Sequence, residues 1–246
     1  MKAYLQRRIP VVVAASLALA MLALGFLAAL GVRSLVAGTA SASPAAPNPG
    51  HEWSQVEGHG IDGSTYWLGT TADQALELRV NGQRALRLEP NADSPSPNVI
   101  GGYSGNSVTD GVWGASIGGG GAGGTTNRVT DLAGTVAGGT NNQAGDNGGT
   151  TSDASGATVG GGGWNTASGD ASFVGGGYSN TASGATASVA GGNTNTASGM
   201  NAAVAGGITN TASGTQASVG GGLSNDASGY LATIGGGQHQ HGQRLV

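Results

Sequence analysis

The sequence predicts an all-β solenoid built from short stacked coils. An apolar column recurs every 15 residues, at Val159, Val174, Val189, Val204, Val219 and Ile234. An asparagine column recurs at the same interval, at Asn165, Asn180, Asn195, Asn210 and Asn225. An Ala-Ser-Gly motif begins two residues after each of these asparagines. A fixed short period with small apolar positions and fixed turn residues is typical of a solenoid.

The period limits what one coil contains. Fifteen residues hold two short strands and two tight corners, but they are too few for a strand plus a helix and its turns. In Ala187-Ser188-Val189 the apolar residues lie two apart, so their side chains share one face of a strand. The glycines after each valine predict a corner, and Asn-Thr-Ala-Ser-Gly predicts the second strand and the next corner. Stacking places each asparagine above the last, where side-chain amides hydrogen-bond in a ladder. Both columns are therefore predicted to be structural.

Self-association is expected from the small size of the inward residues. Valine and alanine bury little apolar surface, and glycine-rich turns lose the most conformational freedom on folding. A single stack of coils would therefore be marginally stable. We expect several copies to form a shared core and predict a long, thin homo-oligomer.

Composition excludes several classes of function. The 246 residues carry a formal net charge of -4, include 50 glycines and no cysteine, and are only 9% charged. Such a composition without a period would indicate disorder. We expect no disulfide framework, and no nucleic-acid binding, because no basic patch exists. Between residues 157 and 237 the only acids are Asp170 and Asp226. We therefore predict no enzyme activity, no cofactor and no metal site.

Residues 1–42 are predicted to be a signal peptide or an N-terminal membrane anchor. A positively charged start precedes a charge-free apolar run over residues 9–32, and Ala40-Ser41-Ala42 forms a small-x-small cleavage site. The apolar run is also long enough to span a bilayer as a hydrophobic helix, which would tether the chain. In both cases the rest of the chain is secreted or lies at the cell surface.

A linker and a small β cap are predicted next. Residues 43–50 are rich in proline and uncharged, as expected for a linker. In residues 51–99, alternating leucines flank Asn81-Gly82, which predicts a β-hairpin with a type I′ turn. We interpret this part as a cap on the first coil; the alternative is a receptor-binding tip.

Residues 100–158 contain the same sequence pattern at irregular intervals, and they precede the regular coils of residues 159–237. The steps between matching apolar residues are 17, 19 and 23, at Ile100, Ile117, Val136 and Val159. The extra residues are expected to form loops, for example at residues 144–149. Insertions in solenoids often carry binding, and flexible filler is an equal alternative here.

Residues 238–246 are predicted to be a C-terminal tail. His239 and His241 lie two apart and would share a face of a strand. Two histidines at that spacing form half of a metal site, but nothing nearby completes it. We therefore do not assign a metal to them.

The regular coils resemble the head repeats of trimeric autotransporter adhesins, the YadA-like family. The resemblance rests on Ala187-Ser188-Val189-Ala190-Gly191-Gly192 and on residues 202–207, each followed two residues later by Asn-Thr-Ala-Ser-Gly. It implies a left-handed parallel β-roll of three chains around one axis. The repeat here is a 15-residue variant, without the family's stalk or C-terminal membrane anchor.

Three functional hypotheses follow. The first is a secreted or cell-surface homotrimer, structural or adhesive, with a host, matrix or glycan surface as its ligand. The second is a fibre or appendage component of a phage-like particle. The third is an ice- or surface-binding solenoid, because threonines recur in a regular column that could order water, at Thr166, Thr181, Thr196 and Thr211.

Overall fold

The computed structural model describes residues 69–70, 73–92 and 94–243 of the chain. By its contacts the chain divides into two units, Met1–Ser54 and Gln55–Val246. All described residues belong to the second unit, which contains the predicted hairpin and coils.

Several predicted segments lie outside the described residues. These are the signal peptide or anchor with its hydrophobic helix over residues 1–42, the linker over residues 43–50, and the first part of the cap. Within the part of the chain that the structure describes, no helix has both the length and the apolarity to cross a bilayer. The tether through residues 9–32 therefore stays a prediction.

A β-hairpin precedes the coils, as predicted. β1 (Leu76–Val80) pairs antiparallel with β2 (Gln83–Asn91). Asn81 and Gly82 connect them with φ angles of 50° and 73°, the positive values that both central residues of a type I′ turn require. β3 (Ser94–Gly101) then pairs antiparallel with β2 and parallel with the next coil strand. The cap and the solenoid therefore share one continuous sheet.

Ion pairs link the charged residues of the hairpin. The Arg79 guanidinium lies 2.5 Å from the Glu77 carboxylate, and Arg87 contacts Glu77 at 3.4 Å and Glu89 at 2.7 Å. The hydrogen bond from Arg79, followed by the charges of Arg79 and Arg87, lowers the pKa of Glu77. Partly exposed pairs contribute little to stability, but charges on an edge strand such as β1 disfavour pairing with another sheet.

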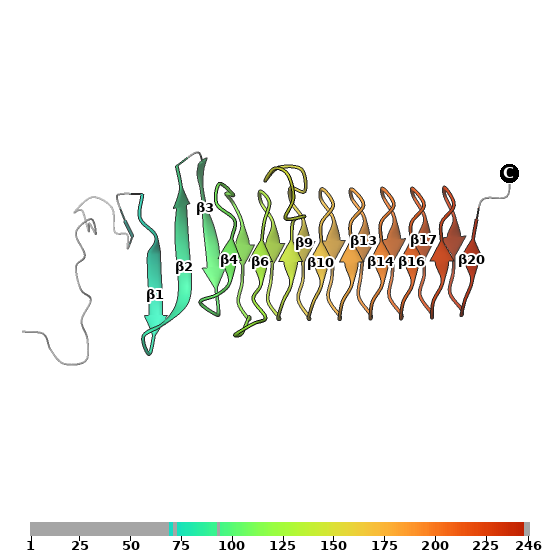
Figure 1. The fold of residues 1–246 in the computed structure, drawn as a ribbon, viewed down its shortest axis with the longest axis horizontal. Helices are drawn as coiled ribbons and strands as arrows, with labels where there is room; N and C mark the ends of the chain where they lie inside the picture. The colour runs from blue at the N-terminus through green and yellow to red at the C-terminus, as the bar shows by residue number, and fades with distance from the viewer. Residues whose placement is uncertain (1–68, 71–72, 93, 244–246) are drawn as a thin grey trace, which may run out of the picture. The chain divides into compact units, whose positions relative to one another are not determined.

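Two parallel sheets form the walls of the solenoid (Figure 1), and each coil contributes one two-residue strand to each sheet. Beyond β3 the first, 11-stranded sheet contains β5 (Ser116–Ile117), β7 (Thr135–Val136), β9 (Thr158–Val159), β11 (Phe173–Val174), β13 (Ser188–Val189), β15 (Ala203–Val204), β17 (Ser218–Val219) and β19 (Thr233–Ile234). The second, 9-stranded sheet contains β4 (Ser107–Val108), β6 (Arg128–Val129), β8 (Gln143–Ala144), β10 (Thr166–Ala167), β12 (Thr181–Ala182), β14 (Thr196–Ala197), β16 (Thr211–Ala212), β18 (Asp226–Ala227) and β20 (His241–Gly242).

A third ladder closes each coil between the two sheets. Single parallel bridges connect Thr140, Gly163, Tyr178, Asn193, Ile208, Leu223 and Gln238 in succession. Main-chain hydrogen bonds therefore run from coil to coil on three sides. The sequence predicted two strands and two corners, and it missed this third side because one bridging residue leaves no alternating pattern.

The strand register confirms the 15-residue period. Val174 pairs with Val189 in the first sheet, and Thr181 pairs with Thr196 in the second. The longer coils place their extra residues outside the strands, as predicted. These residues follow β4, separate β5 from β6 and follow β8.

The apolar core closes within one chain. The valine column is buried on the inner side of the first sheet, with Val159, Val174 and Val189 at 0% exposure. An alanine column, which includes Ala167 and Ala182, faces it from the second sheet and is equally buried. Among the described residues, no inward column is left open for another copy. The expected association of several copies stays a prediction, and it would use the outer faces of the coils.

Two corners of each coil carry residues other than glycine at positive φ. One corner lies between the bridge and the second sheet, at Trp164, Ser179, Thr194, Thr209, Ser224 and His239. The other precedes the first sheet, at Ala171, Thr186, Asn201, Gln216 and Leu231. This conformation strains an ordinary L residue by about 1–2 kcal/mol, and it suits β-branched threonine least. Main-chain bonds between coils, such as Thr209 N–H to Asn193 O at 2.9 Å, hold the corners in place.

Relief of this strain is expected to stabilise the solenoid. Thr209 is exposed and has a φ of 56°. We expect Thr209→Asn to raise the free energy of unfolding by about 1 kcal/mol, because asparagine tolerates the left-handed region. Urea unfolding followed by circular dichroism measures the change. Thr211→Asn, in strand β16, is the control and should give no gain; equal stabilities for the two variants would contradict strain at Thr209.

The coil pattern continues into the predicted C-terminal tail. Gln238 bridges to Leu223, and β20 pairs with β18. The N–H of Gln240 donates to Oδ1 of Asn225 at 2.9 Å, so Gln240 occupies the next position of the asparagine column. Residues 238–242 therefore form part of a coil.

Candidate functional site

The predicted asparagine ladder lies inside the solenoid, as Asn195 illustrates. Its side-chain Nδ2 donates to the carbonyl oxygens of Gly191 and Gly207 at 3.0 and 2.9 Å. Its Oδ1 accepts the main-chain N–H of Asn210 at 2.9 Å, and its Nδ2 lies 3.2 Å from Oδ1 of Asn180. Asn195 is 0% exposed. The ladder thus fixes the glycine corners and the spacing of the coils, and it presents no group to a ligand.

The outer face of the first sheet is uncharged over several coils. Its outward residues from β11 to β19 are small, hydroxylated or apolar. They line an open depression of about 440 Å3, formed by Phe173, Ser188, Ala190, Ala203, Val204, Ala205, Ser218, Val219, Gly220, Thr233, Ile234 and Gly235. Because the side chains are short and repeat every coil, another flat surface can approach this face closely.

Exposed apolar side chains lie one corner away, along the bridge ladder. Tyr178, Ile208 and Leu223 all belong to this ladder and are exposed. The ring of Trp164, also exposed, lies 5.4 Å from the ring of Tyr178. The polar Asn193 lies between Tyr178 and Ile208 in this ladder. Exposed apolar groups on one side of a protein often mark interaction sites. We call these four residues the apolar ridge.

The second sheet presents hydroxyl groups instead. The predicted threonine column is confirmed in register, with Thr166 above Thr181 and Thr196 above Thr211. Serines such as Ser183 and Ser198 follow on the same outer side, two residues after each threonine. Asp226 ends the threonine column and lies 3.6 Å from His241.

The two histidines of the last coil do not form a pair. His239 occupies a corner with a φ of 54°, whereas His241 lies in β20. The prediction that they share one face of a strand is therefore wrong, because the corner ends the alternation between them.

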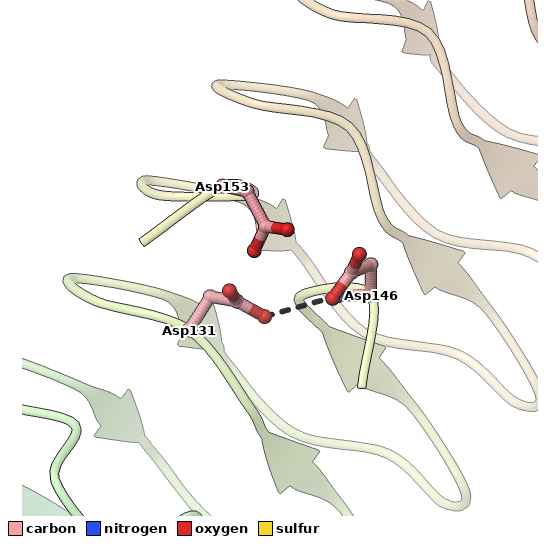
Figure 2. A group of neighbouring side chains, drawn as sticks. All are labelled: Asp131, Asp146 and Asp153. Atoms are coloured by element: carbon pink, nitrogen blue, oxygen red, sulfur yellow. Dashed lines mark hydrogen bonds between the residues drawn. The ribbon is translucent and has the colours of Figure 1, made fainter. Parts of the chain in front are cut away.

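One cluster of acidic residues was missed by the sequence analysis. The carboxylates of Asp131, Asp146 and Asp153 come together beside the longest insertion (Figure 2), with one oxygen from each lying within 4.8 Å of the others. Asp131 follows β6 and Asp146 follows β8, one 15-residue step later, so they stack in neighbouring coils. The 15-residue spacing of Asp131 and Asp146 is the signal for this cluster in the sequence.

Comparisons with family models and with curated proteins find no match for this chain.

Proposed function

We propose that this protein is a secreted or cell-surface β-solenoid that assembles as a homotrimer and serves a structural or adhesive role. The observation that carries the proposal is the uncharged outer face of the first sheet, next to the apolar ridge. Burial of small apolar side chains between copies would stabilise such an assembly.

An identical chain is the best match for this face. Surface residues on the sheet repeat once per coil, so only a partner with the same coil spacing can keep its side chains in register over many coils. Closed symmetric assemblies of identical chains are also the commonest oligomers of soluble proteins. The proposed number of three chains in the assembly rests on the resemblance to YadA-like heads.

An extracytoplasmic location is proposed from residues 1–42, with their charged start, apolar run and Ala40-Ser41-Ala42 site. A rod with repeating surface groups binds through many weak contacts, and multivalency gives useful avidity without one dominant residue. We therefore propose a repetitive surface, such as matrix protein or glycan, as the ligand.

Charge on the proposed interface should prevent assembly. Ala203 is half-buried and points outward from β15, in the uncharged face. We expect Ala203→Arg to convert a trimer into a monomer, because three copies would bury three unpaired guanidinium groups. Sedimentation velocity on the chain from residue 43 onward measures the change. Ser198→Arg, an exposed position beside β14, is the control and should remain trimeric.

Adhesion is tested with cells that display the full chain. Cells that display the unaltered protein should bind immobilised matrix protein or glycan arrays, and cells that display Ala203→Arg should lose this binding. Accessibility of the chain to external protease in the same cells tests the location. A chain that stays inside the cell would favour the phage-like fibre hypothesis.

The hydroxyl face of the second sheet favours one alternative, an ice- or surface-binding solenoid. Threonines in register on a parallel sheet form a flat array at the strand spacing of about 4.8 Å. Thermal hysteresis of the purified chain distinguishes this function, since an adhesin should show none.

A further inference from the structure

Beside the longest insertion, two acidic residues stand in a column that is glycine in the regular coils. In the regular coils, the residue two positions after the second-sheet strand is glycine, as at Gly169. A Cβ at Gly169 would lie 2.5 Å from the carbonyl carbon of Gly184 in the next coil. Asp131 and Asp146 occupy this same column in the irregular coils. The eight extra residues lie between β8 and β9. Beside them, two acidic side chains occupy a column in which the regular coils leave no room for a methyl group.

Asp131 is buried with half of its carboxylate unpaired. The residue is 1% exposed. Its Oδ2 accepts the Thr130 hydroxyl at 2.9 Å and the Asp146 N–H at 3.0 Å, whereas its Oδ1 is buried without a hydrogen-bond partner. Buried carboxylate oxygens are rarely left in this state, because a charged group deprived of water needs a compensating donor or cation.

The unpaired oxygen belongs to a group of three carboxylates. In Figure 2, the Asp153 carboxylate lies over that of Asp131, and Asp146 lies beside them. Among the described residues, no ion pair from arginine, lysine or histidine reaches any of the three. Three like charges this close repel one another unless a positive charge joins them.

The insertion is held in a defined shape around the carboxylates. Leu132 N–H donates to Thr151 O at 2.8 Å, and Gly156 N–H donates to Leu132 O at 2.9 Å. Ala154, next to Asp153, is buried in the described structure. Asp146 Oδ1 accepts the Gly148 N–H at 2.7 Å. These contacts place Asp153 over the neighbouring coil, so the approach of the three side chains follows from the fold of the loop.

We propose that Asp131, Asp146 and Asp153 bind a divalent cation, and that the ion is calcium. Calcium takes oxygen ligands at about 2.3–2.6 Å, so oxygens on opposite sides of it lie about 5 Å apart. Magnesium demands near-ideal octahedral geometry at about 2.0–2.1 Å and is usually held by one or two carboxylates, whereas this cluster offers three. Water completes the coordination on the exposed side, where Asp146 and Asp153 lie. The ion would fasten the insertion to the coil stack.

Calorimetry tests the site directly. We expect CaCl2 titrated into the EDTA-treated chain from residue 43 onward, and into the full chain in detergent, to bind one ion per chain with a dissociation constant of about 10⁻⁴–10⁻³ M, the range of extracellular calcium modules. Asp153→Asn should weaken binding about tenfold or more, because it removes one charged ligand. Asp170→Asn, an exposed acid on a regular coil, is the matched control and should bind as the unaltered chain does.

Hydrogen exchange locates the effect and keeps the proposal testable if a variant folds poorly. In the unaltered chain, calcium should slow exchange in residues 145–156 and leave the regular coils unchanged. Absence of both binding heat and local protection at 10 mM calcium would overturn the site. An equal response to magnesium at matched ionic strength would overturn the choice of calcium, and equal binding by Asp153→Asn would overturn the ligand assignment.

Discussion

Replacement of Gly192 by alanine is expected to destabilise the solenoid strongly, whereas the same change at Gly191 should have little effect. Gly192 has a φ of 94°, and a Cβ there would lie 2.5 Å from Asn195 Nδ2, 2.9 Å from Gly207 N and closer still to Gly207 O. A left-handed alanine costs about 1–2 kcal/mol, and overpacking adds about 1–3 kcal/mol. We therefore expect a loss of about 3 kcal/mol or more in the free energy of unfolding.

Gly191→Ala is the matched control for this prediction. A Cβ at Gly191 would meet only Gly176 O, at the ordinary contact distance of 3.9 Å. The two glycines are neighbours in the same corner, so the two variants have the same amino-acid composition and differ only in which glycine receives the methyl group. Urea unfolding of both variants measures the difference. Similar stabilities for the two would contradict the close stacking of the coils at Gly192.

Replacement of Asn195 by alanine should have an effect of similar size. The change removes the hydrogen bonds to Gly191 O, Gly207 O and Asn210 N–H. Gly207 O keeps the main-chain N–H of Asn193, but Gly191 O and Asn210 N–H are left unpaired. Each unpaired buried group costs about 1–3 kcal/mol, so two such groups give an expected loss of about 2–6 kcal/mol. Thermal and urea unfolding, followed by circular dichroism at a β-sheet wavelength, measure the loss.

Asn193→Ala provides the comparison, because Asn193 is exposed and only two residues away. Its main chain forms the bridge to Tyr178 and Ile208, which alanine preserves. The stability should change by no more than about 0.5 kcal/mol, as for most surface substitutions. If Asn195→Ala were as mild as Asn193→Ala, the buried ladder would not be a major source of stability.

The repeat in the sequence predicted the main features of the fold. The 15-residue columns identified the inward valines, the stacked asparagines and the parallel register, because each coil repeats the same environment. Asn81-Gly82 identified the hairpin, because few residues accept positive φ at both positions of a turn. In these cases the local conformation requires particular residue types, so the residue types predict the conformation.

Other features of the fold could not be predicted from residue type. Threonine at the corner of Thr194 or Thr209 gives no hint of positive φ, since contacts between coils impose that conformation against its preference. The approach of Asp153 to Asp131 depends on how the insertion folds back over the neighbouring coil. The closed core could not be foreseen from the small side chains either, because three sides of main-chain hydrogen bonds, not apolar area alone, bring the walls together.

The molar mass of the chain from residue 43 onward, measured by light scattering over a range of concentrations, tests the proposed assembly most directly. Circular dichroism on the same sample must show β structure, so that a folded protein is measured. The proposal predicts three times the mass of one chain, stable on dilution. A folded monomer at every concentration would contradict a trimeric rod. It would favour the alternative of an ice- or surface-binding solenoid that is stable as one chain and acts through its hydroxyl face.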